Sequence, residues 1–191
     1  MNNLSNNQGY KRDKQKFKRY EKSLPVHRIE LDVRFLERIG DTTKRHYQFS
    51  AIDDYTGLSI LRIYEHNNQV NAIRFVDYTL SRLTFRAEVI QTDHGSEFGS
   101  QFHWHVLDKG IRHVYIKPRR PQLNGKVERS HRIDDEEFYG LLDGIVIDDT
   151  TLINERLREW ENFYNYGKPH PALNGQTPYE WFREKTGLSS V

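Results

Sequence analysis

Three carboxylates far apart in the chain have the surroundings of a phosphoryl-transfer site. Asp32 lies within an apolar run, Asp93 directly follows another, and Glu128 stands in a basic stretch. Acids are spaced this widely when strands and a helix must bring them to one point, and hard divalent cations prefer such oxygen ligands. We therefore predict that Asp32, Asp93 and Glu128 are catalytic and bind metal. The expected cofactor is a pair of Mg²⁺ ions about 3.5–4 Å apart, which Mn²⁺ can replace.

The charge around Glu128 indicates a polyanionic substrate. Residues 111–132 carry seven Lys/Arg and one acid. Cations at this density bind the phosphates of a nucleic acid, independently of its sequence and in a salt-sensitive way. Scattered solubility charges are the alternative, and His131 or Arg132 could instead form surface ion pairs with Asp135 or Glu136. The predicted DNA-binding residues are Lys117, Arg119, Arg120, Asn124, Lys126, Arg129, His131 and Arg132.

The composition excludes several other classes of protein. The chain has 191 residues, of which 36% are hydrophobic, so one globular core is expected. It has no cysteine, which excludes disulfides, thiolate zinc sites and thiol nucleophiles. No apolar run approaches the roughly 20 residues that span a bilayer, so we expect a soluble, cytoplasmic protein without a membrane partner. The net charge of +2 conceals a segregation, because residues 133–149 carry seven acids and no base.

The element that carries Asp32 has the pattern of a β-strand. Residues 29–36 alternate apolar and polar side chains, so Asp32 points away from the apolar face. Two further strand-like runs, 47–53 and 58–64, flank a turn sequence at 54–57 and predict a hairpin. The chain therefore begins its core with three antiparallel strands.

The elements that carry Asp93 and Glu128 follow a different pattern. Helical spacing over 69–84 predicts a crossover helix, after which the strand 87–92 ends at Asp93, where open α/β sheets place reactive groups. A second unit repeats this with a helix near 99–109, a strand at 111–116 and a helix at 123–142 that carries Glu128 on its second turn. The order βββαβαβα predicts an α/β fold with a ribonuclease H-like mixed sheet and helices on both faces.

The remaining residues divide the chain into three parts. A helical stripe from Leu152 through Ile153, Leu157 and Trp160 to Tyr164 stops at Gly167 and should close the core. A capping box with proline at 177–180 predicts a short terminal helix that docks back. We expect a basic, flexible segment at 1–26, a catalytic core at 27–166, and a C-terminal loop and helix at 167–191.

Two motifs, together with Asp32, carry a resemblance to a known family. Gln91–Phe98 reads QTDHGSEF and Lys117–Arg129 reads KPRRPQLNGKVER. Together they closely resemble the catalytic core of DDE insertion-sequence transposases, to which retroviral integrases are more distantly similar. The resemblance runs from about His27 to Trp181. It implies that Asp32, Asp93 and Glu128 are the DDE triad, that DNA ends and target DNA are the substrates, and that the protein assembles on DNA as a dimer or larger oligomer.

The resemblance also implies a reaction and a setting. A water molecule would cleave a phosphodiester at the end of the element, and the freed 3′-hydroxyl would then attack target DNA, giving transposition or integration. We expect a bacterial protein that associates with the nucleoid when it is bound to DNA. Relatives carry a helix-turn-helix ahead of the core, and with about 28 residues before the first catalytic strand we expect a truncated chain that lacks it.

Two residues depart from the pattern of the family. His94 stands where relatives commonly have asparagine, and an imidazole there can hydrogen-bond a phosphate or titrate near neutrality. Asp135 stands where many relatives have a base that contacts transposon-end DNA, so the end contacts of this chain should differ.

Four alternatives stand against the interpretation as a DDE transposase. The chain could be a DNA-binding or regulatory fragment without catalysis, or a nonspecific ribonuclease H-type nuclease. His103 and His105 could suggest a zinc site, but residues two apart on a helix face different directions. A tyrosine-nucleophile recombinase would have no use for three carboxylates.

Overall fold

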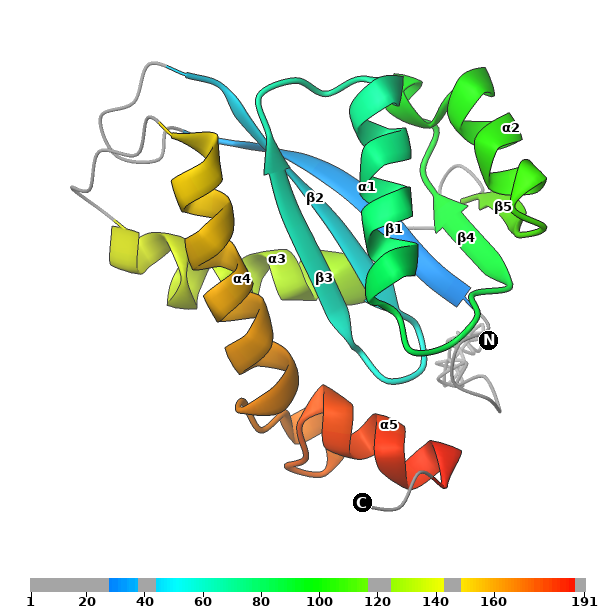
Figure 1. Cartoon of the computed structure of the whole chain (residues 1–191). Helices are drawn as coiled ribbons and strands as arrows, with labels where there is room; N and C mark the ends of the chain where they lie inside the picture. Colours follow the sequence, from blue (N-terminus) through cyan, green and yellow to red (C-terminus); the bar gives the residue numbers. More distant parts are fainter. Residues whose placement is uncertain (1–27, 38–43, 117–124, 143–148, 188–191) are drawn as a thin grey trace, which may run out of the picture.

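A five-stranded mixed sheet forms the centre of the protein (Figure 1). The computed structural model describes residues 28–37, 44–116, 125–142 and 149–187. The strands lie in the order β3-β2-β1-β4-β5, which puts the strand that carries Asp32 in the middle. Their bounds are β1 Arg28–Leu36, β2 His46–Asp53, β3 Ser59–Tyr64, β4 Val89–Thr92 and β5 Arg112–Tyr115.

The first three strands are antiparallel, as the sequence predicts. β1 pairs with β2 so that Asp32 lies opposite Ser50, and β2 pairs with β3 through a short turn. In that turn the Asp53 carboxylate accepts hydrogen bonds from the backbone N–H and the hydroxyl of Thr56, and Gly57 adopts the left-handed conformation that favours glycine. These local bonds fix the register of the hairpin.

The remaining two strands are parallel to β1, and each follows a helix. α1 Gln69–Arg82 begins at Asn68, whose side chain accepts a hydrogen bond from the Asn71 N–H, and connects β3 to β4. β4 is shorter than predicted and begins at Val89. The short 3₁₀ turn η1 Ser96–Phe98 and helix α2 Ser100–Asp108 then lead to β5. The predicted ribonuclease H-like order of elements is confirmed.

Each face of the sheet has its own apolar core. On one face, Leu31, Phe49, Phe75 and Phe102 are buried between the strands and the helices α1 and α2. On the other face, buried residues of β3 pack against α3 Gly125–Glu137 and α4 Thr150–Tyr166, as do the side chains of the 3₁₀ turn η3 Tyr139–Leu142. Because Asp32 alternates with Leu31, it lies on the face covered by α3.

Helix α4 lies along β3 and binds its backbone. The side chains of Asn165, Glu161 and Asn154 accept hydrogen bonds from the N–H groups of Ser59, Leu61 and Ile63, at 2.9, 2.8 and 2.8 Å. These N–H groups belong to the outer edge of the described sheet and would otherwise lack a strand partner. The contact with α4 therefore completes the hydrogen bonding of that edge.

The apolar stripe predicted for α4 is confirmed except at its first residue. Ile153, Leu157, Trp160 and Tyr164 are buried, whereas Leu152 is 46% exposed. Leu152 lies one residue before Ile153, about 100° around the helix from it, so its side chain points away from the stripe that packs on the sheet. The prediction that Leu152 contributes to the core was wrong.

The C-terminal part docks on the core through α5 Pro178–Thr186 (Figure 1). The predicted capping box is present, because the Thr177 hydroxyl accepts from the Glu180 N–H and the Glu180 carboxylate accepts from the Thr177 N–H. Phe182 is buried and contacts the ring of Phe85. The predicted basic segment 1–26 lies outside the described residues. None of the helices in the described ranges is long and apolar enough to cross a membrane.

The contact between α4 and β3 gives a stability prediction. Glu161→Ala leaves the Leu61 N–H and the guanidinium of Arg82, which donates to Glu161 at 2.7 Å, without their buried acceptor. Because unpaired buried polar groups are costly, we expect the free energy of unfolding to fall by about 3 kcal/mol. Glu159→Ala on the same helix is the control, since the Glu159 side chain is 70% exposed. Urea titration of both variants measures the difference, and equal midpoints would contradict the prediction.

Candidate active site

Asp32 occupies the middle of the central strand. It sits on β1 opposite Ser50, and its side chain is 16% exposed. The alternation of the strand turns it toward α3, as the sequence predicts. A carboxylate in this position is held by rigid backbone on both sides and has little water around it.

Asp93 lies directly after β4, where the sequence places it. The parallel register pairs Ile29 with Ile90 and Glu30 with Gln91, and the same register continued by two residues along both strands would set Asp32 opposite Asp93. The Asp93 carboxylate accepts a hydrogen bond from the Gly95 N–H at 2.9 Å, which closes a turn at the strand end. Asp93 is exposed and therefore accessible to a substrate.

Glu128 extends from α3 into solvent. The described part of the helix begins at Gly125, and Glu128 lies in the first turn of that part. The predicted start near residue 123 falls outside the described residues. Val127 on one side of Glu128 is fully buried, as is Ser130 two residues beyond it, and these side chains anchor the helix while Glu128 remains free to reach toward the strands.

The charges of these acids meet at Asp32. Burial raises the pKa of Asp32 to about 6, and the negative charges of Asp93, Glu97 and Glu128 push it in the same direction. Three carboxylates therefore lie within electrostatic reach of Asp32. Within the residues that the structure describes, no three metal-ligating side chains stand close enough together to hold an ion.

Glu97 is a site residue that sequence reasoning missed. It belongs to η1 and is 7% exposed. A Cβ atom added at Gly95 would lie 2.7 Å from the carboxyl atoms of Glu97, so a larger residue at position 95 would require the Glu97 side chain to move. The signal was present in the 91–98 motif, in which an acid follows Asp93 at four residues, but spacing alone does not show that the side chain folds back.

A second missed acid, Glu30, lies beside Asp32 on the same face of β1. It is 4% exposed, and burial together with the charge of Asp54 raises its pKa to about 8, although Lys126 and Arg28 act in the opposite sense. Glu30 is therefore protonated at neutral pH. Its strand periodicity was visible in the sequence, but the depth at which it is buried depends on α3.

Lys126, one of the predicted DNA-binding residues, contacts the turn between β2 and β3. Its Nζ donates to the backbone carbonyl of Asp54 and lies 3.0 Å from the carboxylate of the same residue. The side chain remains 42% exposed, so part of its charge is still presented to solvent. This pair holds the first turn of α3 against the hairpin.

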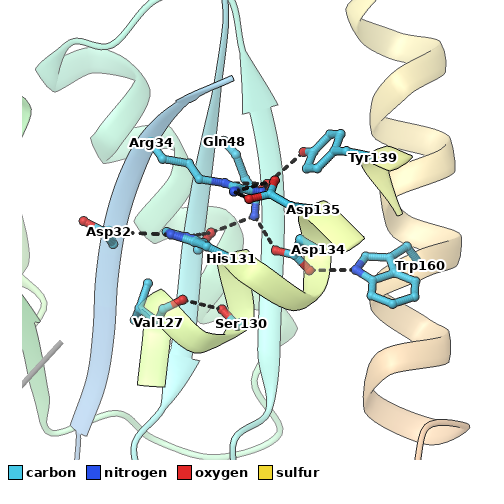
Figure 2. Close-up of polar contacts among 11 residues, drawn as sticks. Asp32, Arg34, Gln48, Val127, Ser130, His131, Asp134, Asp135, Tyr139 and Trp160 are labelled. Atoms are coloured by element: carbon cyan, nitrogen blue, oxygen red, sulfur yellow. Dashed lines mark hydrogen bonds and ion pairs between the residues drawn. The ribbon is translucent and has the colours of Figure 1, made fainter. Parts of the chain in front are cut away.

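His131 does not lie on the surface, where the prediction of a DNA contact would place it. Its side chain is 10% exposed, its Nε2 is 2.9 Å from the Ser50 hydroxyl, and its Nδ1 is 3.7 Å from Asp32 (Figure 2). Burial and the charge of Arg34 lower its pKa to about 3, so the imidazole is neutral. His131 was predicted to contact DNA or to form a surface ion pair. Its buried position beside Asp32 agrees with neither prediction.

A network of buried polar side chains connects this histidine to α4 (Figure 2). The Gln48 amide donates to the Ser50 hydroxyl at 3.0 Å and to the Asp134 carboxylate at 2.8 Å, and the Trp160 indole donates to Asp134 at 2.8 Å. Burial raises the pKa of Asp134 to about 6, while the Trp160 and Gln48 hydrogen bonds oppose the rise. The network fixes α3 between the sheet and α4.

Asp135 is engaged within the protein. Both of its carboxylate oxygens accept from Arg34 at 2.7 Å, in a pair that crosses from α3 to β1. Asp135, which stands where similar transposases have a basic residue, therefore holds α3 against the sheet. Arg132 lies 3.9 Å from Glu136, so for this residue the predicted surface pair is present.

The other predicted DNA-binding residues divide into two groups. Arg129 and Arg132 are exposed on α3, and Lys126, Arg129 and Lys185 border a cavity of about 300 Å³ between α3 and α5. This cavity lies on the flank of α3 opposite Glu128. Four predicted residues lie outside the described residues, namely Lys117, Arg119, Arg120 and Asn124.

The two histidines of the zinc alternative point to different partners. The Nδ1 of His103 is 2.9 Å from the Nδ1 of His113, whereas the Nε2 of His105 is 2.8 Å from the carboxylate of Asp77. The two rings therefore belong to separate contacts on either side of α2.

The sequence is similar to one protein family and to one viral protein. Residues 109–178 match the family model of the integrase core domain, a range that includes Glu128 and all of α3 and α4. The chain is 28% identical over 171 residues to ORF3 of Spiroplasma virus SpV1-C74, a candidate integrase. The match covers 80% of this chain and 46% of ORF3, so the chain spans about half the length of this curated relative.

Solved structures with the same fold include retroviral integrase cores. A chain of the simian T-cell lymphotropic virus intasome matches with a TM-score of 0.73 at 19% identity, covering 85% of this chain and 56% of the other. The HTLV-2 integrase catalytic core in complex with magnesium matches at 0.66 and 19%, covering 83% and 97%. The catalytic core of BIV integrase matches at 0.64 and 19%, covering 85% and 97%.

The chain has an integrase/transposase-like core. The family model matches the segment that contains β5, α3 and α4, and the solved cores match the fold over 83–85% of this chain. The predicted resemblance is thus confirmed at the level of the core.

Glu30 gives a prediction on how stability depends on pH in this integrase-like core. A buried acid with a raised pKa favours folding most below its unfolded pKa of 4.5, and the advantage is lost as the pH rises through about 8. Glu30→Gln removes this loss, so its stability relative to wild type should rise by a few kcal/mol between pH 5 and pH 9. Urea unfolding in EDTA at both values measures this.

The control for this prediction is Glu155→Gln, which changes an exposed residue of α4. Its stability relative to wild type should stay constant over the same range. If Glu30→Gln also stays constant, the carboxyl of Glu30 is ionised in the folded protein and the proposed protonation is wrong.

Proposed function

We propose that the protein is the catalytic core of a DNA transposase or integrase, which cleaves DNA strands and transfers their ends to new positions. Asp32, Asp93 and Glu128 would be the catalytic, metal-binding residues. The observation that carries the proposal is the position of Asp32 on the central strand of an integrase-like fold, where burial, followed by the charges of Asp93, Glu97 and Glu128, raises its pKa to about 6. Clustered acids are costly to a fold, and a cation offsets that cost.

The donor chemistry fits Mg²⁺. The three side chains supply only hard oxygen ligands, the type that Mg²⁺ and Mn²⁺ prefer, and no cysteine is present to favour softer metals. When bound, two such ions would activate the attacking oxygen and stabilise the leaving oxygen of a phosphodiester. The HTLV-2 integrase core, which shares the fold, was solved with magnesium.

The residues of the chain would divide the work by their rigidity. Asp32 is fixed on β1, and His131 supports it from α3 at 3.7 Å. Asp93 is exposed at the end of β4, and Glu128 is exposed in the first turn of α3, so both are accessible to DNA. Among the residues that the structure describes, a Cβ added at Gly125 would meet nothing within 4 Å, which would let backbone approach the substrate there.

The phosphate contacts would come from basic residues on and before α3. Arg129 and Arg132 are exposed on the helix, and part of Lys126 is accessible. Lys117, Arg119, Arg120 and Asn124 precede it in sequence and are proposed for the same role. His131 is better suited to hold Asp32 than to reach a phosphate, because it is buried.

Two steps would take place at this one site. In the first, water attacks a phosphorus atom, the bond to the 3′ oxygen breaks, and that oxygen leaves with a proton as a free 3′-hydroxyl. In the second, this hydroxyl attacks a phosphodiester of target DNA, and the displaced strand leaves with its own 3′ oxygen protonated. No covalent bond between protein and DNA is formed.

The proposed partners are transposon-end and target DNA and further copies of the chain. Intasome and dimeric or trimeric forms are described for the retroviral proteins that share the fold. Two DNA ends that are joined together require more than one active site, so an oligomer assembled on DNA is proposed here as well. Association with a bacterial nucleoid would follow from DNA binding.

Asp93→Asn tests the enzyme directly. The amide keeps the shape of the side chain but loses the charge that attracts a cation, so nicking and joining of labelled DNA in Mg²⁺ or Mn²⁺ should fall by at least about 100-fold. Asp108→Asn, an exposed acid at the end of α2, is the matched control and should retain wild-type activity. DNA binding without products from the wild-type protein would favour a catalytically silent regulatory fragment.

The raised pKa of Asp32 gives a second prediction. A proton and a metal ion compete for this carboxylate, so Mg²⁺ affinity should fall as the pH drops below about 6. The increase in melting temperature caused by Mg²⁺ should be large at pH 7.5 and nearly absent at pH 5. In the Asp32→Asn variant, the increase in melting temperature caused by Mg²⁺ should be small at both pH 7.5 and pH 5. An effect of equal size at both values in the wild-type protein would contradict the assignment of Asp32 as a ligand.

A further inference from the structure

A row of aromatic rings leads along the surface from α2 to the loop that holds Asp93. His94 stacks on Tyr115 with ring centroids 4.9 Å apart and an interplanar angle of 11°. Tyr115 is nearly parallel to His103 at 6.1 Å and 17°, and Trp104 meets His103 edge-on at 5.5 Å. The row lies over α2, β4 and β5, the green elements at the right of Figure 1.

Hydrogen bonds hold the two inner rings of this row, Tyr115 and His103, in place. The Tyr115 hydroxyl donates to the Phe98 carbonyl at 2.8 Å, and the Nδ1 atoms of His103 and His113 are 2.9 Å apart. The Nε2 of His113 is in turn 2.9 Å from the Thr92 hydroxyl, which donates to the Asp93 carbonyl at 2.8 Å. The row is therefore connected to the strand end that positions Asp93, and its inner rings, Tyr115 and His103, have little side-chain entropy left to lose when a ligand binds.

The two ends of the row are exposed. His94 is exposed beside Asp93, and Trp104 is 62% exposed at the far end. An exposed aromatic ring that is packed against a neighbouring ring offers a flat surface to which a planar ligand can bind. One face of His94 is covered by Tyr115, which leaves its other face available to a planar ligand.

We propose that the free face of His94 stacks with an unpaired nucleobase next to the phosphodiester that is cleaved. A substrate phosphate acted on at Asp93 brings its attached nucleoside to within one residue of His94, and every base offers a flat surface to an aromatic ring. The position of the stack would set which nucleotide lies at the carboxylates. This inference rests on the proposed function, because it assumes that DNA is bound there.

The choice of a base over a protein partner follows from the neighbours of the ring. His94 directly follows Asp93 and precedes Gly95, against which the Glu97 carboxyl lies, so an acidic or purely apolar peptide would meet unfavourable charges or polar surface. A nucleotide brings its own phosphate and its metal counterions to the carboxylates while its base occupies the ring. The imidazole replaces the asparagine that is common in similar transposases, so the stack would distinguish this chain.

Two substitutions separate stacking from hydrogen bonding. His94→Phe keeps an aromatic face and loses the ring nitrogens, whereas His94→Asn keeps polar atoms and loses the face. DNA with 2-aminopurine at the unpaired base next to the cleavage position reports stacking as fluorescence quenching. We expect quenching with wild type and His94→Phe, little with His94→Asn, and about tenfold weaker binding of the end with a single-stranded overhang by His94→Asn. His66→Asn, an exposed histidine before α1, is the control and should behave as wild type.

Metal-dependent nicking of the same DNA keeps the inference separate from the proposed function. If wild-type protein nicks the DNA but all variants quench equally, the stack is absent and the function stands. If His94→Asn quenches and His94→Phe does not, a hydrogen bond replaces the stack and the inference is wrong. If wild type neither binds nor nicks the DNA, the inference and the proposed function fail together. Melting temperatures of the variants identify any loss of folding.

Discussion

The partial burial of the Asp32 carboxylate is the constraint on which the site depends. A charged group on the central strand loses much of its hydration, and the structure raises the pKa of Asp32 further by placing other acids around it. A fold that only needed stability would place an apolar side chain there. This loss of hydration is confined to Asp32. The other two acids of the site, after β4 and in the first described turn of α3, are exposed to solvent.

The polar network beneath α3 explains how a helix with few apolar side chains is held in one position. His131, Gln48 and Asp134 are buried and bonded to one another or to their neighbours, and Trp160 links them to α4. A displacement of α3 by one residue would leave several of these groups buried without partners, which is more costly than a loss of apolar contact. The network therefore determines where Glu128 stands more sharply than hydrophobic packing could.

Much of the fold could be predicted because its elements have local signals. Alternation identified β1 to β3, helical spacing identified α1 and α4, and the Thr177 capping box was present where expected. Asp32 and Asp93 could be placed because strand position alone decides where they point. Glu97, Glu30 and the buried position of His131 could not be predicted, since their burial is produced by contacts between elements that are distant in sequence. The prediction for Leu152 was wrong for a local reason, because at about 100° per residue it lies off the face that Ile153, Leu157 and Tyr164 share.

The hydrogen bonds from α4 to β3 also limit how the sheet can grow. Every outward N–H of β3, from Ser59 through Leu61 to Ile63, already has a side-chain acceptor, so no foreign strand can add there without displacing the helix. The opposite boundary of the described sheet is β5, only four residues long. Fibril-like stacking and strand exchange between copies are thereby disfavoured in a molecule that must gather several copies of itself on DNA to perform the proposed reaction.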